Sequence, residues 1–170
     1  SYVNTYDLDC VITRCTNNYG PRQFYEKLIP KTIFLANQNK KIPIYGKGEN
    51  IRDWIYVNDH CEAVFRVLLD GKKGESYNVS SDNEIDNLSI VKKILELLGK
   101  SSDLIEFVTD RPGHDLRYSL NSSKIKNSLK WNPKISFDDG IQNTIDWLIN
   151  NSRGKDISEN ILGSTPWKKS

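Results

Sequence analysis

Short apolar runs typical of β-strands alternate along this sequence with longer stretches that have the apolar spacing of amphipathic helices. We expect strands at Asp9–Thr16, Ile42–Tyr45, Ile51–Val57, Ser76–Val79 and Leu104–Val108. We expect helices at Ser1–Tyr6, at Glu26–Asn39, from Asn58-Asp59 to about Leu69, from Asn87 or Ser89 to Gly99, at Ser122–Leu129 and at Phe137–Asn150. Because strands that alternate with helices build sheets covered by helices, the pattern predicts an α/β fold.

Charge and composition argue against several classes of protein. The 24 basic and 22 acidic residues nearly balance, which gives no reason to expect binding to nucleic acid or to a membrane. The 3 cysteines have no metal-ligand spacing and there are only 2 histidines, so no metal site is expected. Since no apolar run has membrane-spanning length and the N-terminus lacks a signal-peptide pattern, we expect a soluble cytoplasmic protein.

Polar side chains follow the first expected strand directly. Asn17 and Asn18 open the segment Asn17–Pro21, whose Asn, Gly and Pro residues predict a loop. In open α/β sheets, ligands bind beyond the carboxyl ends of strands, where amides can donate to phosphate oxygens or to a carboxamide. The alternative is that these asparagines only form the turn, because asparagine tolerates left-handed backbone conformations.

An arginine lies inside the expected strand Ile51–Val57. Arg52 could form a structural ion pair with Asp53 or Asp59. It could equally offer its planar set of donors to a diphosphate, a role in which lysine is a poor substitute. The residues alone leave both alternatives open.

The segment Asp110–His114 (DRPGH) is expected to be a tight loop. Pro112 and Gly113 would hold Arg111 and His114 close together, and two donor groups on one rigid loop suit an anionic ligand. The alternative is a surface turn with solvated charges.

Pro43-Ile44-Tyr45 offers an apolar wall and an aromatic ring against which a base or a sugar could pack, although core packing is the alternative. The sequence contains neither a G-x-G-x-x-G turn, which cradles dinucleotide phosphates, nor a G-x-S-x-G nucleophile motif. Conventional nucleophile signatures are thus missing, and no carboxylate pair stands out.

Four segments together resemble the C-terminal half of the dTDP-glucose 4,6-dehydratases, which belong to the extended short-chain dehydrogenase/reductase class. These segments are Thr16–Pro21 (TNNYGP), Phe24–Pro30 (FYEKLIP), Ile42–His60 (IPIYGKGENIRDWIYVNDH) and Asp110–Tyr118 (DRPGHDLRY). The stretch Leu129–Ile141 (LKWNPKISFDDGI) also fits. The resemblance implies the C-terminal part of an extended Rossmann-like fold over residues 1–150, followed by a polar tail at 151–170.

The resemblance also implies roles for matching positions. Nucleotide-sugar contacts are implied for Asn17, Lys27, Leu28, Pro43, Ile44, Tyr45, Arg52, Asn87, Asp110, Arg111, Pro112, Gly113 and His114. Among these, Arg52 would hold the diphosphate, Pro43–Tyr45 would flank the thymine base, and Asp110–His114 would close over the nucleotide. Asn18 would approach the nicotinamide of NAD, the cofactor of the parent family.

This chain departs from the family pattern in its chemistry. The glycine-rich NAD fingerprint and the Tyr-x-x-x-Lys catalytic motif do not occur in it. We therefore expect a chain that binds a nucleotide sugar of the dTDP-glucose type but binds no NAD and is inactive by itself. A complementing N-terminal chain or self-association are possible partners. Alternatives are a fragment of a related epimerase or decarboxylase, or a stand-alone binding or regulatory module.

Overall fold

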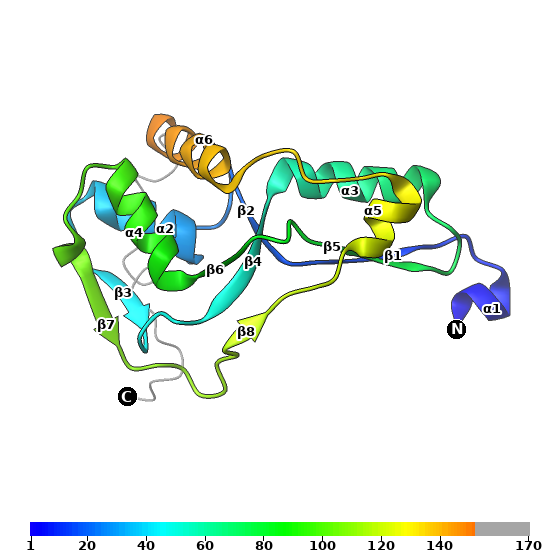
Figure 1. Cartoon of the computed structure of the whole chain (residues 1–170), viewed down its shortest axis with the longest axis horizontal. Coiled ribbons are helices and arrows are strands. Elements are labelled where there is room, and N and C mark those ends of the chain that lie inside the picture. Colours follow the sequence, from blue (N-terminus) through cyan, green and yellow to red (C-terminus); the bar gives the residue numbers. More distant parts are fainter. Residues whose placement is uncertain (152–170) are drawn as a thin grey trace.

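The computed structural model describes residues 1–151 of the chain (Figure 1). Its helices are α1 (Tyr2–Tyr6), α2 (Leu28–Asn37), α3 (Val57–Asp70), α4 (Asn87–Leu97), α5 (Ser123–Leu129) and α6 (Phe137–Asn150), with one 3₁₀ turn at Ser102–Leu104. Its strands are β1 (Ile12–Cys15), β2 (Asn17–Tyr19), β3 (Ile42–Tyr45), β4 (Ile51–Tyr56), β5 (Ser76–Val79), β6 (Glu84–Asp86), β7 (Ile105–Val108) and β8 (Arg117–Tyr118). The tail predicted for 151–170 lies outside the described residues from position 152 onward.

The described strands form three small sheets, and most of their pairings are parallel. β1 pairs with β5, and β3 pairs with β7, both in parallel. In the third sheet the central strand β4 pairs in parallel with β2 and β8 and antiparallel with β6. Parallel pairs need long crossover connections, which the helices supply in this chain, so the expected α/β architecture is confirmed.

The strand β2 replaces part of a predicted loop. Asn17–Tyr19 pairs with Trp54–Tyr56 of β4, so the prediction of a loop at Asn17–Pro21 is wrong for its first three residues. The turn preference of these residue types was overridden by pairing with a strand that is distant in sequence. Asn17 pairs with Trp54, which lies 37 positions further along the chain. The short strands β6 and β8 were not predicted, and both are held by the same β4.

Several element boundaries also differ from the prediction. The first strand begins at Ile12 instead of Asp9, and α2 begins at Leu28 instead of Glu26. Helix α3 begins at Val57 with Tyr56 as its N-cap, so Asn58 and Asp59 do not cap it. Asp59 instead lies in the first turn, where its buried carboxylate accepts the backbone N–H of Ile135 at 3.0 Å.

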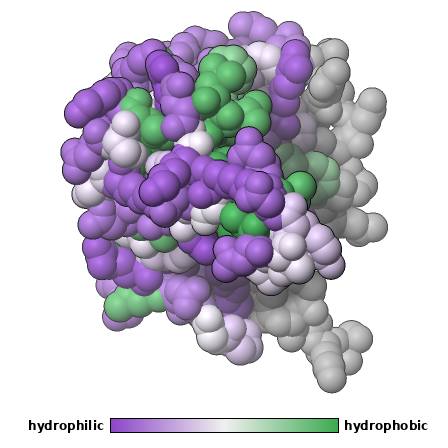
Figure 2. All heavy atoms as spheres, turned by 90° about the vertical axis from the view of Figure 1, so that its right-hand side faces the viewer, coloured by the Kyte–Doolittle hydropathy of each residue, from purple (hydrophilic) through white to green (hydrophobic). Residues whose placement is uncertain are grey.

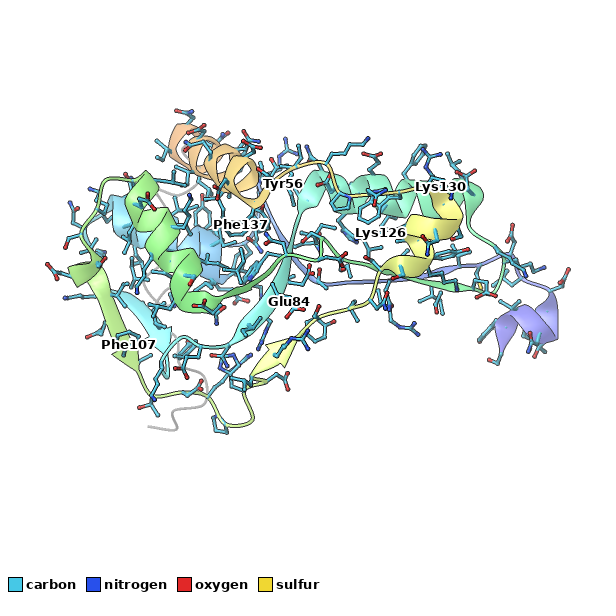
Figure 3. The ribbon with its side chains drawn as sticks, in the orientation of Figure 1. Tyr56, Glu84, Phe107, Lys126, Lys130 and Phe137 are labelled. Carbon is cyan, nitrogen blue, oxygen red and sulfur yellow. The ribbon has the colours of Figure 1, made fainter. Side chains whose placement is uncertain are left out.

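Aromatic residues form the centre of the largest buried cluster. Tyr19 of β2 lies 5.6 Å from Tyr56 of β4 and 5.3 Å from Phe137 of α6, measured between ring centroids. Phe137 and Tyr56 are labelled where α6 begins above β4 in Figure 3. Isoleucines of α2, α4 and α6 pack around these rings. This cluster fixes β2 and β4, the two strands whose ends carry the candidate site.

Helix α3 keeps part of its apolar surface in solvent. Phe65, Leu68 and Leu69 are 60%, 70% and 63% exposed, and Ile12 of the nearby strand β1 is 51% exposed. The view onto this end of the molecule shows apolar patches among hydrophilic residues (Figure 2). Among the described residues, no helix is both long enough and apolar enough to span a membrane.

Candidate functional site

A cavity of about 570 Å³ lies where β2, β3 and β4 meet the first turns of α2 and α4. Its size falls within the range of about 300–1,000 Å³ that is usual for small-molecule sites. The lining residues are Asn17, Asn18, Gln23, Glu26, Lys27, Leu28, Lys31, Pro43, Ile44, Tyr45, Arg52, Trp54, Asn87, Arg111 and His114.

The cavity brings together most of the residues that were singled out from the sequence. Asn17, Asn18, Lys27, Leu28, Pro43, Ile44, Tyr45, Arg52, Asn87, Arg111 and His114 all line it. Asp110, Pro112 and Gly113 are not among the lining residues, although they shape the loop that carries Arg111. Sequence reasoning missed Gln23, Glu26, Lys31 and Trp54. The spacing of four between Lys27 and Lys31 places both on one helix face, a signal that could have found the second lysine.

Arg52 is buried and has no carboxylate partner among residues 1–151. Only 8% of Arg52 is exposed, and its guanidinium donates to the backbone carbonyls of Ile51 (2.7 Å), Asp115 (2.7 Å) and Leu116 (3.5 Å). The alternative of an ion pair with Asp53 or Asp59 is therefore wrong. Burial lowers the pKa of Arg52; the charge of Asp115 opposes this shift, and the charge of Arg111 adds to it. An arginine nevertheless stays charged in a protein, so Arg52 is a buried cation whose described bonds all go to neutral oxygens.

The loop after β7 is held by one carboxylate. Asp110 Oδ1 accepts the backbone N–H of Arg111 at 2.8 Å and lies 2.7 Å from Nδ1 of His114. The bond to His114 is the largest cause that lowers the pKa of Asp110. Gly113 has a φ of +67°, a conformation that favours glycine. Arg111 and His114 of this loop line the same cavity as Arg52.

One wall of the cavity is apolar and aromatic. Pro43 and Tyr45 of β3 are half-buried, while Ile44 between them belongs to the core. Burial raises the pKa of the Tyr45 hydroxyl, although the charge of Arg111 opposes this. Asn87 stands at the start of α4 across from this strand and also lines the cavity. A flat ring could pack on this wall while its polar edge meets amides and cations.

The amide of Asn18 has one buried oxygen that bonds to no described residue. Its Nδ2 donates to the carbonyl of Thr16 and to Sγ of Cys15, both at 3.2 Å, whereas Oδ1 has no hydrogen bond. Gln23 donates through Nε2 to the Asn18 carbonyl at 2.8 Å, and its own Oε1 is also buried and unpaired. Buried acceptors without partners are rare, so both oxygens are available to a ligand that presents N–H or O–H donors.

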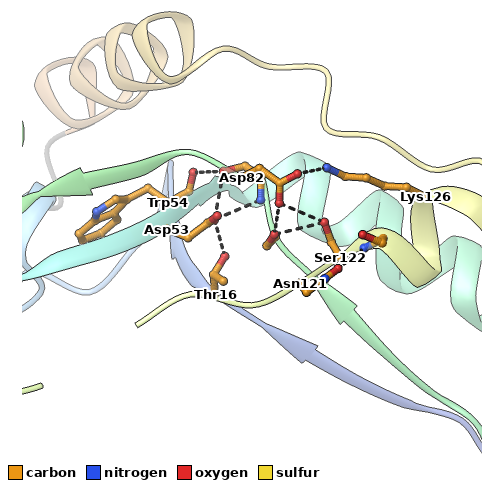
Figure 4. Close-up of polar contacts among 10 residues, drawn as sticks. Thr16, Asp53, Trp54, Asp82, Asn121, Ser122 and Lys126 are labelled. Carbon is orange, nitrogen blue, oxygen red and sulfur yellow. Dashed lines mark hydrogen bonds and ion pairs between the residues drawn. The ribbon is translucent and has the colours of Figure 1, made fainter. Parts of the chain in front are cut away.

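A buried polar network lies behind the cavity (Figure 4). Asp53 of β4 is fully buried, and its Oδ1 accepts the Thr16 hydroxyl at 2.9 Å and the backbone N–H and hydroxyl of Ser81, each at 3.1 Å. Its Oδ2 bonds to none of the described residues. The network continues from Ser81 along the chain to Asp82, whose carboxylate meets Ser122 and Lys126 of the α5 region. The network connects Thr16, which precedes Asn17, to Asp53, which follows Arg52.

The charges of the described lining indicate the kind of ligand that this cavity suits. No cluster of three or more His, Cys, Asp or Glu side chains that could hold a metal ion occurs within residues 1–151. The described lining holds four cations, Lys27, Lys31, Arg52 and Arg111, against the single carboxylate of Glu26. An anion with a flat ring attached matches this distribution of charge and shape.

Comparisons with known proteins show the family of the chain. Residues 1–144 match the sequence profile of the family described as GDP-mannose 4,6 dehydratase. The dTDP-glucose 4,6-dehydratase 1 of Escherichia coli is 43% identical over 163 residues, a match that covers 92% of this chain and 45% of the relative. The chain thus spans about half the length of the curated relatives it matches.

Solved structures give the same result for the fold. The dTDP-glucose 4,6-dehydratase of Bacillus anthracis, in complex with NAD, is 49% identical with a TM-score of 0.84, covering 88% of this chain and 48% of that one. The enzyme of Streptomyces venezuelae, solved with NAD and a second ligand, is 42% identical with a TM-score of 0.86, covering 88% and 47%. The Rossmann-like fold of the extended short-chain dehydrogenase/reductase class is confirmed by these neighbours.

Proposed function

The chain belongs to the GDP-mannose 4,6-dehydratase family, and on that premise we propose that it forms the nucleotide-sugar-binding part of a dTDP-glucose 4,6-dehydratase. The observation that carries this proposal is the cavity that Arg52 and Arg111 share with the Pro43–Tyr45 wall of β3. Two cations without carboxylate partners among the described residues suit a diphosphate, and the Pro43–Tyr45 wall suits a pyrimidine base. The curated relatives named dTDP-glucose 4,6-dehydratase support this choice of base and sugar.

We further propose that the redox chemistry belongs to other residues of the whole protein. NAD, when bound, would accept and return a hydride. The described residues offer a contact only for the nicotinamide end of this cofactor. There the unpaired Oδ1 of Asn18 could accept a hydrogen bond from the carboxamide of the nicotinamide. The sequence contains no glycine-rich phosphate turn and no Tyr-x-x-x-Lys motif. On this proposal the chain corresponds to the C-terminal half of its relatives and is inactive by itself.

Titration calorimetry with dTDP tests the binding function. We expect heat of binding well below 1 mM ligand for the wild-type chain, and weaker heat with UDP, which lacks the thymine methyl group. Arg111→Gln should weaken dTDP binding by about 10- to 150-fold, because it removes a charged hydrogen bond worth roughly 1.5–3 kcal/mol. Arg111 is exposed, so its replacement leaves the core intact.

The matched control is Arg66→Gln, which removes the same charge from the exposed surface of α3, where Arg66 pairs with Asp70 at 3.1 Å. This variant should bind dTDP as the wild type does. Absence of heat with every nucleotide up to about millimolar concentration would refute the proposal, since charge-assisted contacts in a formed pocket exceed that affinity.

A further inference from the structure

Helix α2 and its N-cap present two lysines to the cavity, and only one of them has an ion-pair partner among the described residues. Lys27 and Lys31 are four residues apart and both line the cavity. The ammonium group of Lys27 lies 2.6 Å from the carboxylate of Glu26. The ammonium group of Lys31 makes no hydrogen bond or ion pair with any described residue, although Lys31 is half-buried. Lysine side chains usually extend their charge into water, so a half-buried lysine without a partner requires an explanation.

The position of Lys31 is also electrostatically unfavourable within the protein itself. It stands at the end of the first turn of α2, near the positive pole of the helix dipole, and that turn contains no acidic residue. Burial lowers the pKa of its ammonium group, while Glu26 opposes this shift. Arg52 and Arg111 add two more positive charges to the same cavity. Glu26, the single carboxylate of the described lining, compensates this charge only in part, because it already pairs with Lys27.

The described lining of the cavity therefore carries an excess of positive charge that an anionic ligand would balance. Its four cations exceed its one carboxylate by three charges. Of these, Arg52 and Arg111 were anticipated from the sequence as contacts for an anion. Resting on the proposed function, we propose that Lys31 is a third cationic contact to the phosphates of the nucleotide. Lys31 is thus an affinity determinant on α2 that faces the arginines of β4 and of the Asp110–His114 loop.

The test compares Lys31→Gln with the wild type by titrating dTDP at several salt concentrations, and by titrating thymidine in parallel. The variant should bind dTDP about five- to tenfold more weakly, which is the fold-change expected for one partly screened charged contact. Its affinity should fall less steeply with added salt, because one phosphate contact is missing. Its affinity for thymidine, which has no phosphate, should be unchanged.

Thermal melting separates this role from a structural one. Since Lys31 is a half-buried cation without a described partner, Lys31→Gln should melt at the same temperature as the wild type or at a higher one. Weaker binding together with equal or higher stability is a result that a merely structural lysine would not give. The control Lys92→Gln removes a charge from the exposed side of α4 and should change neither binding nor melting.

The outcomes distinguish the two proposals. If the wild type binds dTDP and Lys31→Gln binds it equally well, the role of Lys31 is refuted while the pocket stands. If the variant loses dTDP and thymidine affinity in equal measure, Lys31 contacts the base, and the phosphate assignment is wrong. If the wild type itself binds no dTDP, both proposals fall together.

Discussion

Asp53 offers a sharp test of how the site is held in place. One of its oxygens, Oδ1, accepts three hydrogen bonds, from the Thr16 hydroxyl and from the backbone N–H and hydroxyl of Ser81, and the other accepts none from the described residues. Asp53→Ala would leave the Thr16 hydroxyl and the Ser81 N–H without a partner, whereas the Ser81 hydroxyl keeps its 2.7 Å bond to the Trp54 carbonyl.

The expected loss of stability follows from these contacts. Each stranded donor costs about 1–3 kcal/mol, and removal of a desolvated carboxylate returns a part of this. We therefore expect Asp53→Ala to lower the free energy of unfolding by about 2–4 kcal/mol, which corresponds to a fall in Tm of roughly 4–16 °C for a chain of this size. Asp53→Asn keeps an acceptor oxygen in place of Oδ1, so it should cost less than about 1 kcal/mol.

Urea unfolding followed by circular dichroism measures both variants. Asp146→Ala is the control, because Asp146 is exposed on α6 and accepts a hydrogen bond from Gln142, so its removal should change stability by less than about 0.5 kcal/mol. If Asp53→Asn were as damaging as Asp53→Ala, the negative charge rather than the acceptor geometry would be essential. Hydrogen bonding to Oδ1 would then fail to explain why Asp53 stabilises the fold.

Two further changes have defined outcomes. A Cβ at Gly140 would lie 2.2 Å from the hydroxyl oxygen of the buried Tyr19. Gly140→Ala should therefore lower the free energy of unfolding in urea by about 1–3 kcal/mol. Adding Tyr19→Phe should recover part of this free energy, and no recovery would contradict the assigned clash. The pKa of Asp110 lies below its ordinary 3.8 because His114 bonds its carboxylate, so the contribution of this bond to stability is complete above the ordinary pKa and is lost as the pH falls through the lowered one. An NMR titration of the Asp110 carboxyl should give a midpoint below 3.8, and His114→Ala should raise it; an unchanged midpoint in that variant would refute the assigned cause.

The elements that could be predicted are those whose local pattern is strong. Ile42–Tyr45, Ser76–Val79 and Phe137–Asn150 have the boundaries expected from their apolar spacing. The strands β2, β6 and β8 could not be predicted, because each is three residues or shorter and exists only by pairing with β4. Their residues have turn-forming or charged side chains, and the pairing energy comes from a distant part of the chain.

Part of the candidate site could be predicted from the chemistry of single residues and from short motifs, and part could not. Arg52, Arg111 and Tyr45 were singled out from residue chemistry, and the cavity brings them together. The carbonyl partners of Arg52 were not foreseeable, because Asp115 and Leu116 lie more than 60 positions away. Lys31 was missed, although its spacing of four from Lys27 places both lysines on one helix face, and the three-dimensional arrangement shows that it lines the cavity.

The two sides of the cavity belong to separate sheets, which has a consequence for how such pockets diversify. The apolar wall lies on β3, which among the described strands pairs with β7, whereas Arg52 lies on β4 in another sheet. Residues of β3 can therefore change during evolution, or be redesigned to accept a different ring, without shifting the strand register that places the arginine. Recognition of the ring and the placement of Arg52 are therefore separately adjustable in this scaffold, whereas Arg111 follows β7, which pairs with the strand of the apolar wall.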